Sequence, residues 1–310
     1  MSKPILVVAV GGNALLQRGE TMSCENQVKN IDKTTAALAK LSERYRLVIV
    51  HGNGPQVGLL ALQNLNYTET PPYPLDVLGA ESQGMIGYLI EQGIQKVMPE
   101  KRCTTILTQI EVDATDPAFS DPTKYIGPVY DEQQAQSLAQ QHGWHIKQDG
   151  QYWRRVVPSP LPQRIVEIDS IQTLLNRDHI VICCGGGGAP VVREQGRLRG
   201  VEAVIDKDFA AAVLAKQLAA EHFVILTDGE NVCVDWGKPT ERPLFEISAD
   251  EIEQYQFAEG SMKPKVDACV QFARATSGIG HIGDLHKAME ITTYQSGTHI
   301  YVEKTLEPAL

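Results

Sequence analysis

Residues 181–192 read VICCGGGGAPVV, and this stretch places four consecutive glycines directly after an apolar run. Glycine loses the most conformational freedom on folding and offers no side chain for packing, so regular structure disfavours it. Four together indicate a place where the backbone needs positive φ angles, or where a ligand closely approaches backbone N–H groups. β-forming residues on both sides, Val181 with Ile182 and Val191 with Val192, argue against a flexible linker. The stretch predicts a buried strand that ends in a glycine turn.

Two more apolar runs end in glycine turns. Gly11-Gly12-Asn13 follows the run 4–10, and Gly52-Asn53-Gly54 follows the run that starts at residue 46. Ligands of open α/β sheets bind outside the carboxyl ends of the strands, where outward-pointing N–H groups cradle anions. Three such turns favour an anionic, phosphorylated ligand. Three tight turns with purely structural roles are the alternative.

Apolar periodicity alternates between the strand type and the helix type along most of the chain. The expected helices are 25–45, 78–98, 206–221 and 264–276, and the expected strands include 103–112 and 222–228. This alternation predicts an α/β fold with a mainly parallel sheet.

Residues 113–163 break this rhythm, because they are rich in Asp, Pro, Gln and aromatic residues. We interpret them as a small subdomain with a β-hairpin around Asp149-Gly150. A disordered linker is the alternative, which the recurring Trp, Tyr, Ile and Val residues disfavour.

Bulk composition excludes several function classes. The 310-residue chain has a formal net charge of −10, whereas general nucleic-acid binders are basic. No apolar run approaches the roughly 20 residues of a membrane span, and no signal-peptide cleavage pattern follows the N-terminus. The six cysteines have no CxxC spacing and the eight histidines form no HExxH pattern, so we expect a cytoplasmic protein with reduced cysteines and no dedicated metal site.

Lysines stand at several expected helix starts. Asp206-Lys207-Asp208 opens one helix, Lys263 and Lys265 open another, and Lys124 lies in the 113–163 segment. A cation at the positive end of a helix is unfavourable unless an anion lies opposite, and a phosphate would be such an anion. Phosphoryl transfer needs groups of this kind, because the protein mainly positions the reactants and neutralises their charge. Any one of these lysines taken alone is more often simply solvated surface.

Known nucleotide motifs do not explain these features. The chain has no GxxxxGK[ST] motif, and GIGHIG at residues 278–283 matches GxGxxG by chance, since it follows an expected helix and not a strand.

Several long blocks together resemble the carbamate kinases of the amino-acid-kinase family. They include VAVGGNALL, VIVHGNGPQVGLL, YIGPVY, WRRVVPSPLPQRIVE, GVEAVIDKDFAAAVLA, VILTDGENVCVDWGKP and GSMKPKV, and the resemblance runs from about residue 4 to residue 302.

This resemblance implies a three-layer αβα sandwich with a protruding subdomain at about 113–163. Residues 1–200 would form an N-terminal lobe that binds carbamoyl phosphate or carbamate, and residues 201–310 a nucleotide-binding lobe. The implied reaction is the reversible transfer of a phosphoryl group between carbamoyl phosphate and MgADP, giving ATP and carbamate. The resemblance also implies a homodimer, with Mg²⁺ held mostly by the nucleotide phosphates.

The resemblance assigns site residues by motif. Gly11, Gly12, Asn13, Gly52 and Asn53 would line the phosphates and the small substrate. Lys124, Lys207, Asp208 and Lys265 would be catalytic, and Asp206, Asp228, Trp236, Lys238 and Lys263 would lie near the nucleotide. Tyr125 departs from the family, which usually has proline after the subdomain lysine.

Two other functions stay open at this point. One is a kinase of the same fold with another acceptor, which the long 113–163 segment disfavours. The other is a catalytically weak, nucleotide-binding regulatory protein. The presence of all four charged catalytic candidates disfavours it.

Overall fold

A mainly parallel sheet forms the centre of the molecule. The computed structural model describes residues 3–17 and 19–303. Within them, eight strands form one sheet in the order β15-β17-β16-β12-β1-β2-β9-β3. All neighbouring pairs from β16 to β3 are parallel, whereas β17 is antiparallel to β16. The strands are β1 (Ile5–Val10), β2 (Arg46–His51), β3 (Cys103–Thr105), β9 (Ile180–Ile182), β12 (His222–Thr227), β15 (Glu246–Ser248), β16 (Ile279–Asp284) and β17 (Thr298–Tyr301).

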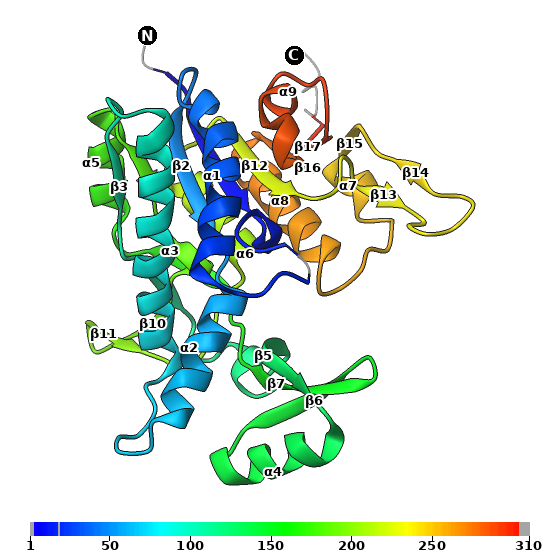
Figure 1. Cartoon of the computed structure of the whole chain (residues 1–310). Coiled ribbons are helices and arrows are strands. Elements are labelled where there is room, and N and C mark those ends of the chain that lie inside the picture. Colours follow the sequence, from blue (N-terminus) through cyan, green and yellow to red (C-terminus); the bar gives the residue numbers. More distant parts are fainter. Residues whose placement is uncertain (1–2, 18, 304–310) are drawn as a thin grey trace.

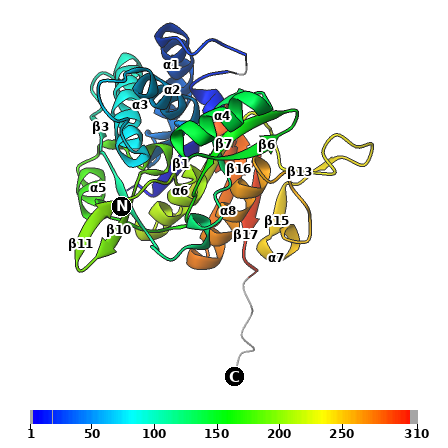
Figure 2. The ribbon, with the colours of Figure 1, turned by 90° about the horizontal axis from the view of Figure 1, so that it is seen from below.

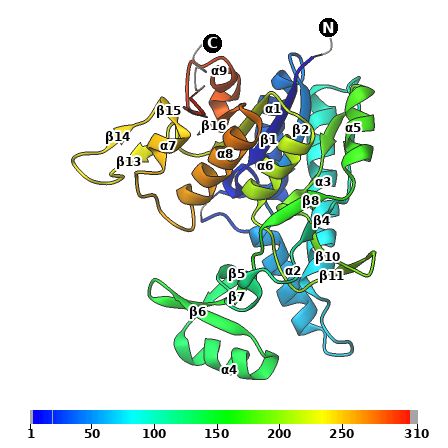
Figure 3. The same cartoon turned by 180° about the vertical axis from the view of Figure 1, so that it is seen from behind.

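Strand β1 shows why the sheet is covered on both faces. Its residues are all buried, and successive side chains of a strand point to opposite faces. Ile5, Val7 and Ala9 join the core under α5 (Ile168–Asn176), α6 (Lys207–Gln217) and α8 (Met262–Thr276). The alternate residues join the core under α1 (Cys24–Leu41), α3 (Leu75–Val97) and α9 (Ala288–Thr292). Figures 1 and 3 show these two helix layers from opposite sides, which confirms the αβα sandwich.

The expected strand 103–112 is wrong as a single element. It divides into β3 in the central sheet and β4 (Gln109–Val112) in a second sheet, whose order is β11-β10-β4-β8. At the division, the Gln83 side-chain amide accepts from the backbone N–H of Thr108 at 2.9 Å and donates to its carbonyl at 3.2 Å, and that carbonyl also accepts from the N–H of Ala189 at 2.9 Å. The Gln83 side chain thus binds the backbone N–H of Thr108 at the point where the chain passes from one sheet to the other. The other strands of this sheet are β8 (Pro162–Ile165), β10 (Ala189–Glu194) and β11 (Arg197–Gly200).

The four glycines 185–188 allow the chain to pass through a crowded junction. They follow β9 and form the short 3₁₀ turn η3 (Gly185–Gly187) before β10. A Cβ on Gly185 would lie 2.3 Å from His51 Nε2, and one on Gly186 would lie 2.0 Å from the Asn53 amide. Gly186, Gly187 and Gly188 also have positive φ angles. Both the packing and the backbone conformation therefore require glycine here.

We expect Gly187→Ala to destabilise the fold by about 3 kcal/mol, because its φ is +92° and its Cβ would lie 2.1 Å from the Ile205 carbonyl oxygen. Gly196→Ala is the matched control. Its φ is +79° but nothing lies within 4 Å of the new Cβ, so only about 1 kcal/mol of backbone strain is expected. Urea unfolding of both variants measures the difference, and equal losses would contradict the crowding argument.

The 113–163 segment contains an ordered subdomain, so the disordered-linker alternative is wrong. An antiparallel sheet of order β5-β7-β6 packs with helix α4 (Glu132–His142) and stands away from the central sheet in Figure 1, while Figure 2 shows this subdomain from below, in front of the body. Its strands are β5 (Lys124–Tyr130), β6 (His145–Asp149) and β7 (Tyr152–Val157). The hairpin turns at Gly150, which has φ +62°, as the sequence predicts.

The subdomain meets the body at helix α2 (Gly54–Asn66). A Cβ on Gly58 of this helix would lie 3.0 Å from the Cα of Gly127 in β5, so the two glycines permit a close approach. A small apolar cluster that includes Val57, Ile126 and Val157 fills the joint.

The remaining elements are short. An arm with β13 (Cys233–Val234) and β14 (Arg242–Pro243) extends to one side in Figure 1 and precedes α7 (Ala249–Ile252). Short 3₁₀ turns follow several strands or precede helices: η1 (Gly12–Ala14), η2 (Pro117–Phe119) and η4 (Leu285–Lys287). GIGHIG falls largely within strand β16, so it forms no phosphate-binding turn of the dinucleotide type.

Candidate active site

The carboxyl ends of the parallel strands place the glycine turns at one edge of the sheet. Gly11 follows β1, and its N–H donates to the carbonyl of Leu226 in β12 at 3.0 Å. Gly52 follows β2, and a Cβ at this position would lie 3.5 Å from the Lys207 side chain and 3.9 Å from the N of Gly12. Bare backbone from two strand ends therefore faces a lysine at the start of α6. This edge is where open α/β sheets bind ligands.

A buried carboxylate holds two lysines beside these turns. Asp208 Oδ1 accepts from Lys207 Nζ at 2.5 Å, and its Oδ2 accepts from Lys265 Nζ at 3.0 Å. The Asp208 side chain is only 3 % exposed, and the two lysine side chains are also largely buried. Lys207 starts α6 and Lys265 lies in the first turn of α8, so both helix N-termini point into this centre.

Burial and the neighbouring charges shift the pKa of each of these groups in opposite directions. Burial alone would raise the pKa of Asp208, but Lys207 and Lys265 outweigh it and lower that pKa to about 2. Burial lowers the pKa of Lys207, partly offset by Asp208. Burial would lower the pKa of Lys265, but the charge and hydrogen bond of Asp208, helped by Asp206 and Asp228, together outweigh burial and raise that pKa. Asp208 is therefore a carboxylate at neutral pH.

Lys124 joins the centre from the subdomain. Its Nζ donates to Asp206 Oδ2 at 2.5 Å, and the other oxygen of Asp206 accepts from the backbone N–H of Asp208 as the N-cap of α6. The three ammonium groups of this chain of ion pairs face two carboxylates, so one positive charge is in excess. Together with the two helix N-termini, this excess attracts an anion.

Asn53 is fixed beside the lysine centre. Its amide Nδ2 donates to Ser82 Oγ of α3 at 2.7 Å, and its side chain fills the space left by Gly186. The backbone of Asn13 lies in η1, but its side chain lies outside the described part of the structure. Sequence reasoning missed Ser82, for which the small residues on one face of the expected 78–98 helix were the available signal.

His51 is a second residue that sequence reasoning missed. It is the last residue of β2, and its Nδ1 donates to the carbonyl of Gly52 at 2.8 Å. The ring is fully buried against the glycine run, and this burial lowers its pKa to about 4. The available signal was its place directly before a glycine turn.

We expect His51 to make the fold less stable in acid. Its pKa is near 4 when folded and near 6.5 when exposed, so between these values the unfolded chain binds more protons. Its contribution is complete above pH 6.5 and is lost as the pH falls towards 4, by about 3 kcal/mol. Denaturant unfolding measures the free energy of unfolding between pH 7 and pH 4.5. This free energy should fall less steeply with decreasing pH in His51→Gln than in the wild type. His286→Gln, an exposed control, should keep the wild-type slope, and an unchanged slope in His51→Gln would contradict the argument.

Asp228 faces a separate cavity at the same edge. Gly11, Thr227 and Asp228 line this cavity of about 360 Å³, together with Asp284 and His286 after β16. The charge of Asp228 also helps to raise the pKa of Lys265, so the cavity lies within electrostatic reach of the lysine centre. Asp284 was not predicted, although its place at a strand end was a usable signal.

Three predicted nucleotide-binding residues have contacts elsewhere. Trp236 is 75 % exposed on the β13–β14 arm, where Lys238 pairs with Asp235 at 2.9 Å. Lys263 pairs with Asp267, one turn further along α8, at 2.8 Å. The structure thus brings Asp206 and Asp228 near the lysine centre, and gives Lys238 and Lys263 partners outside it.

The described residues contain neither a metal-binding cluster nor a membrane-crossing helix. Between residues 3 and 303, leaving out residue 18, no group of three or more His, Cys, Asp or Glu side chains is arranged to hold a metal ion. Over the same residues, no helix combines the length and the apolar character that crossing a bilayer requires.

Fold and site together define an α/β protein in which a buried lysine centre lies between two helix starts and the glycine turns of a parallel sheet. Residues 4–282 match the model of the Amino acid kinase family. The chain belongs to the amino acid kinase family.

Several proteins that are similar to this chain over most of its length are carbamate kinases. The carbamate kinase of Haemophilus influenzae is 51 % identical over 297 residues, which are 95 % of this chain and 96 % of that protein. The carbamate kinase of Pyrococcus furiosus is 45 % identical over 308 residues, with coverages of 95 % and 98 %. The structure of the carbamate kinase from Giardia lamblia bound to AMP-PNP superposes with a TM-score of 0.91 at 41 % identity, covering 97 % of this chain and 99 % of that one.

Proposed function

We propose that the protein is a carbamate kinase, which transfers a phosphoryl group reversibly between carbamoyl phosphate and ADP. The products in the ATP-forming direction are ATP and carbamate. The observation that carries the proposal is the buried Lys207–Asp208–Lys265 centre, which lies against the glycine turns of β1 and β2. Identity of 51 % with a carbamate kinase over nearly the whole chain supports the choice of substrate.

Direct in-line transfer suits this arrangement. The bond between the phosphoryl group and the carbamate oxygen breaks as a β-phosphate oxygen of ADP forms the new bond, so no covalent enzyme intermediate is needed. Lys207 and Lys265 neutralise the charge on the transferring oxygens, and Asp208 holds both ammonium groups in place. Backbone N–H groups of Gly12, Gly52 and Asn53 cradle the phosphoryl group, with Gly11 and Asn13 beside them; the N–H of Gly11 itself is bonded to Leu226.

Lys124 of the subdomain adds a third ammonium group to the lysine centre. It reaches Asp206 across the joint, and an incoming phosphate would compete with Asp206 for its ammonium group. This contact would make closure of the subdomain depend on the presence of substrate.

Each of the two lobes would bind one of the two substrates. Residues 1–200 bind carbamoyl phosphate, and residues 201–310 bind the nucleotide, with Asp206, Asp228, Trp236, Lys238 and Lys263 towards the nucleotide. Mg²⁺ usually takes one or two carboxylates plus substrate phosphates, and Asp228 and Asp284 at the strand-edge cavity fit this pattern. When bound, the ion would neutralise charge on the phosphate oxygens.

We further propose a cytoplasmic homodimer. The cysteines in the described part of the chain are all free, which suits a reducing compartment. The dimer follows from the resemblance to the family, and sedimentation at micromolar concentration tests it.

ATP formation from MgADP and carbamoyl phosphate tests the proposed function. Acetyl phosphate serves as the control donor. Rapid ATP formation with a strong preference for carbamoyl phosphate is expected. No ATP from folded protein that binds ADP would favour a kinase with another acceptor or a regulatory protein.

A further inference from the structure

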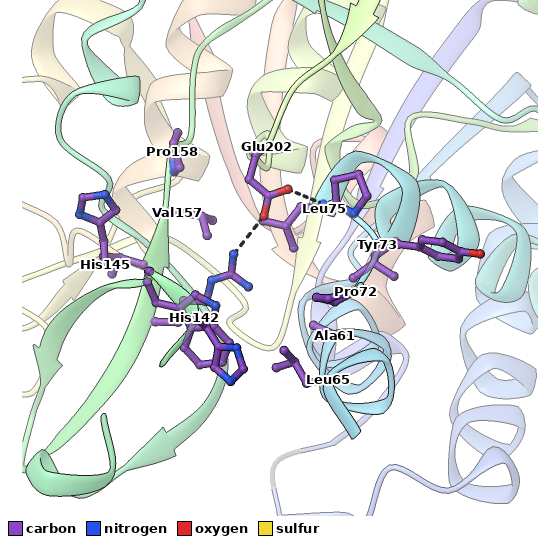
Figure 4. A pocket seen from close by; sticks show the side chains of 16 residues that line it. Ala61, Leu65, Pro72, Tyr73, Leu75, His142, His145, Val157, Pro158 and Glu202 are labelled. Atoms are coloured by element: carbon purple, nitrogen blue, oxygen red, sulfur yellow. Dashed lines mark hydrogen bonds and ion pairs between the residues drawn. The ribbon is translucent and has the colours of Figure 1, made fainter. Parts of the chain in front are cut away.

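Glu202 links the subdomain to the body of the molecule. Its Oε1 accepts from Arg155 Nη2 of β7 at 3.0 Å, and its Oε2 accepts from the backbone N–H of Leu75 at 2.7 Å. Figure 4 shows both bonds converging on the one carboxylate. Leu75 starts α3, so the negative charge also lies at the positive end of a long helix. The carboxylate therefore joins two elements that belong to different parts of the fold.

The strand register connects this link to Lys124. In the β5–β7 pair, Ile126 lies opposite Arg155 and Lys124 lies opposite Val157. A shift of Arg155 relative to the body would therefore carry Lys124 with it. Arg155 is also fixed on the subdomain side, because its guanidinium lies 4.8 Å above the Trp144 ring.

The rest of the joint leaves room for such a shift. A cavity of about 410 Å³ lies between α2, the start of α3 and the subdomain, and Arg155 and Glu202 form part of its wall (Figure 4). Beside this cavity, the contact between α2 and β5 consists of the close approach of Gly58 and Gly127 and the small apolar cluster with Val57, Ile126 and Val157. Lys124 itself is 40 % exposed and makes one ion pair, with Asp206, so its position depends on how the subdomain is held.

We propose that Glu202 is a positioning residue, which sets the place of Lys124 in phosphoryl transfer by holding Arg155 against the N-terminus of α3. This inference rests on the proposed function. Glu202 does not belong to the chain of ion pairs around Asp208, and it acts through β7 and β5. Misplacement of a reacting group by about 1 Å can cost a hundredfold in rate, so even a small shift of the joint would be measurable.

Glu202→Gln tests the proposal with little change of shape. Glutamine still accepts from the Leu75 N–H but loses the charge that holds Arg155. We expect kcat to fall about tenfold while KM for ADP stays within about twofold, the range for a subtle misplacement. Glu194→Gln is the matched control, because it removes an Arg–Glu pair with Arg199 on the exposed β10–β11 hairpin and should leave kcat unchanged.

The same Glu202→Gln substitution in a protein that already lacks the Lys124 ammonium group distinguishes a role in positioning Lys124 from a general structural role. In Lys124→Met, which retains a reduced rate, Glu202→Gln should have no further effect on kcat, because the group it positions is gone. An equal loss in both backgrounds would overturn the proposal, as would a wild-type kcat in Glu202→Gln itself.

The rate of amide hydrogen exchange at residues 124–130 tests how firmly the subdomain is held, and this measurement does not depend on enzymatic activity. Faster exchange in Glu202→Gln than in Glu194→Gln is expected, and equal exchange would contradict the link. If the wild type forms no ATP from carbamoyl phosphate, the proposed function fails and this exchange measurement still decides whether Glu202 holds the subdomain.

Discussion

Replacement of Lys265 by alanine is expected to lower turnover at least a hundredfold. Lys265 lies in the first turn of α8, and Asp208 holds its ammonium group 3.0 Å away in a largely buried centre. Loss of one preorganised donor to developing charge typically costs a hundredfold to a thousandfold in kcat. Steady-state ATP formation from carbamoyl phosphate and MgADP measures the effect.

The control for this variant is Lys216→Ala, which removes an exposed lysine from the other end of α6. It should retain wild-type turnover. The fold of Lys265→Ala should remain, because Asp208 keeps its bond to Lys207, and circular dichroism checks this. Near-normal turnover in a folded Lys265→Ala protein would contradict the proposed mechanism.

Much of this site could be predicted from local sequence signals. The glycines after β1, β2 and β9 marked strand ends, and parallel strands bring their carboxyl ends to one edge. Lys207 was identified because a cation at a helix start conflicts with the helix dipole. The structure resolves that conflict with Asp208, whose carboxylate faces two lysines from different helices.

Other features depended on contacts that no local pattern records. The division of the expected strand 103–112 lies at Thr108, whose backbone groups bind the Gln83 side chain, a residue distant in sequence. His51 stands directly before a glycine turn in the sequence, but only the fold places the glycine run 185–188 against its ring. Glu202 carried no signal at all, since its partners Arg155 and Leu75 come from separate segments.

Replacement of Asp208 by alanine is expected to destabilise the protein by about 3–5 kcal/mol, the usual loss when one partner of a buried ion pair is removed. Two lysines would then remain in a buried centre without the carboxylate that they share. Burial already lowers the pKa of Lys207, so without Asp208 this lysine would lose its charge more readily. Turnover should therefore fall at least as far as in Lys265→Ala. Urea unfolding measures the stability, and ATP formation at low denaturant measures the turnover.

Two further variants show how much of the expected loss of stability is due to the burial of the Asp208 ion pairs and how much to the charge of Asp208. Asp267→Ala removes a similar pair with Lys263, but both side chains are about one-third exposed or more, so a loss of about 0–1 kcal/mol is expected. Asp208→Asn keeps the shape and one oxygen acceptor, but it loses the charge and places an NH2 donor against one of the two lysines. If the charge holds the two lysines, Asp208→Asn should lose nearly as much stability as Asp208→Ala. If Asp208→Asn instead matched the wild type in stability and turnover, hydrogen bonding alone would hold the lysines, and the electrostatic account of the site would be wrong.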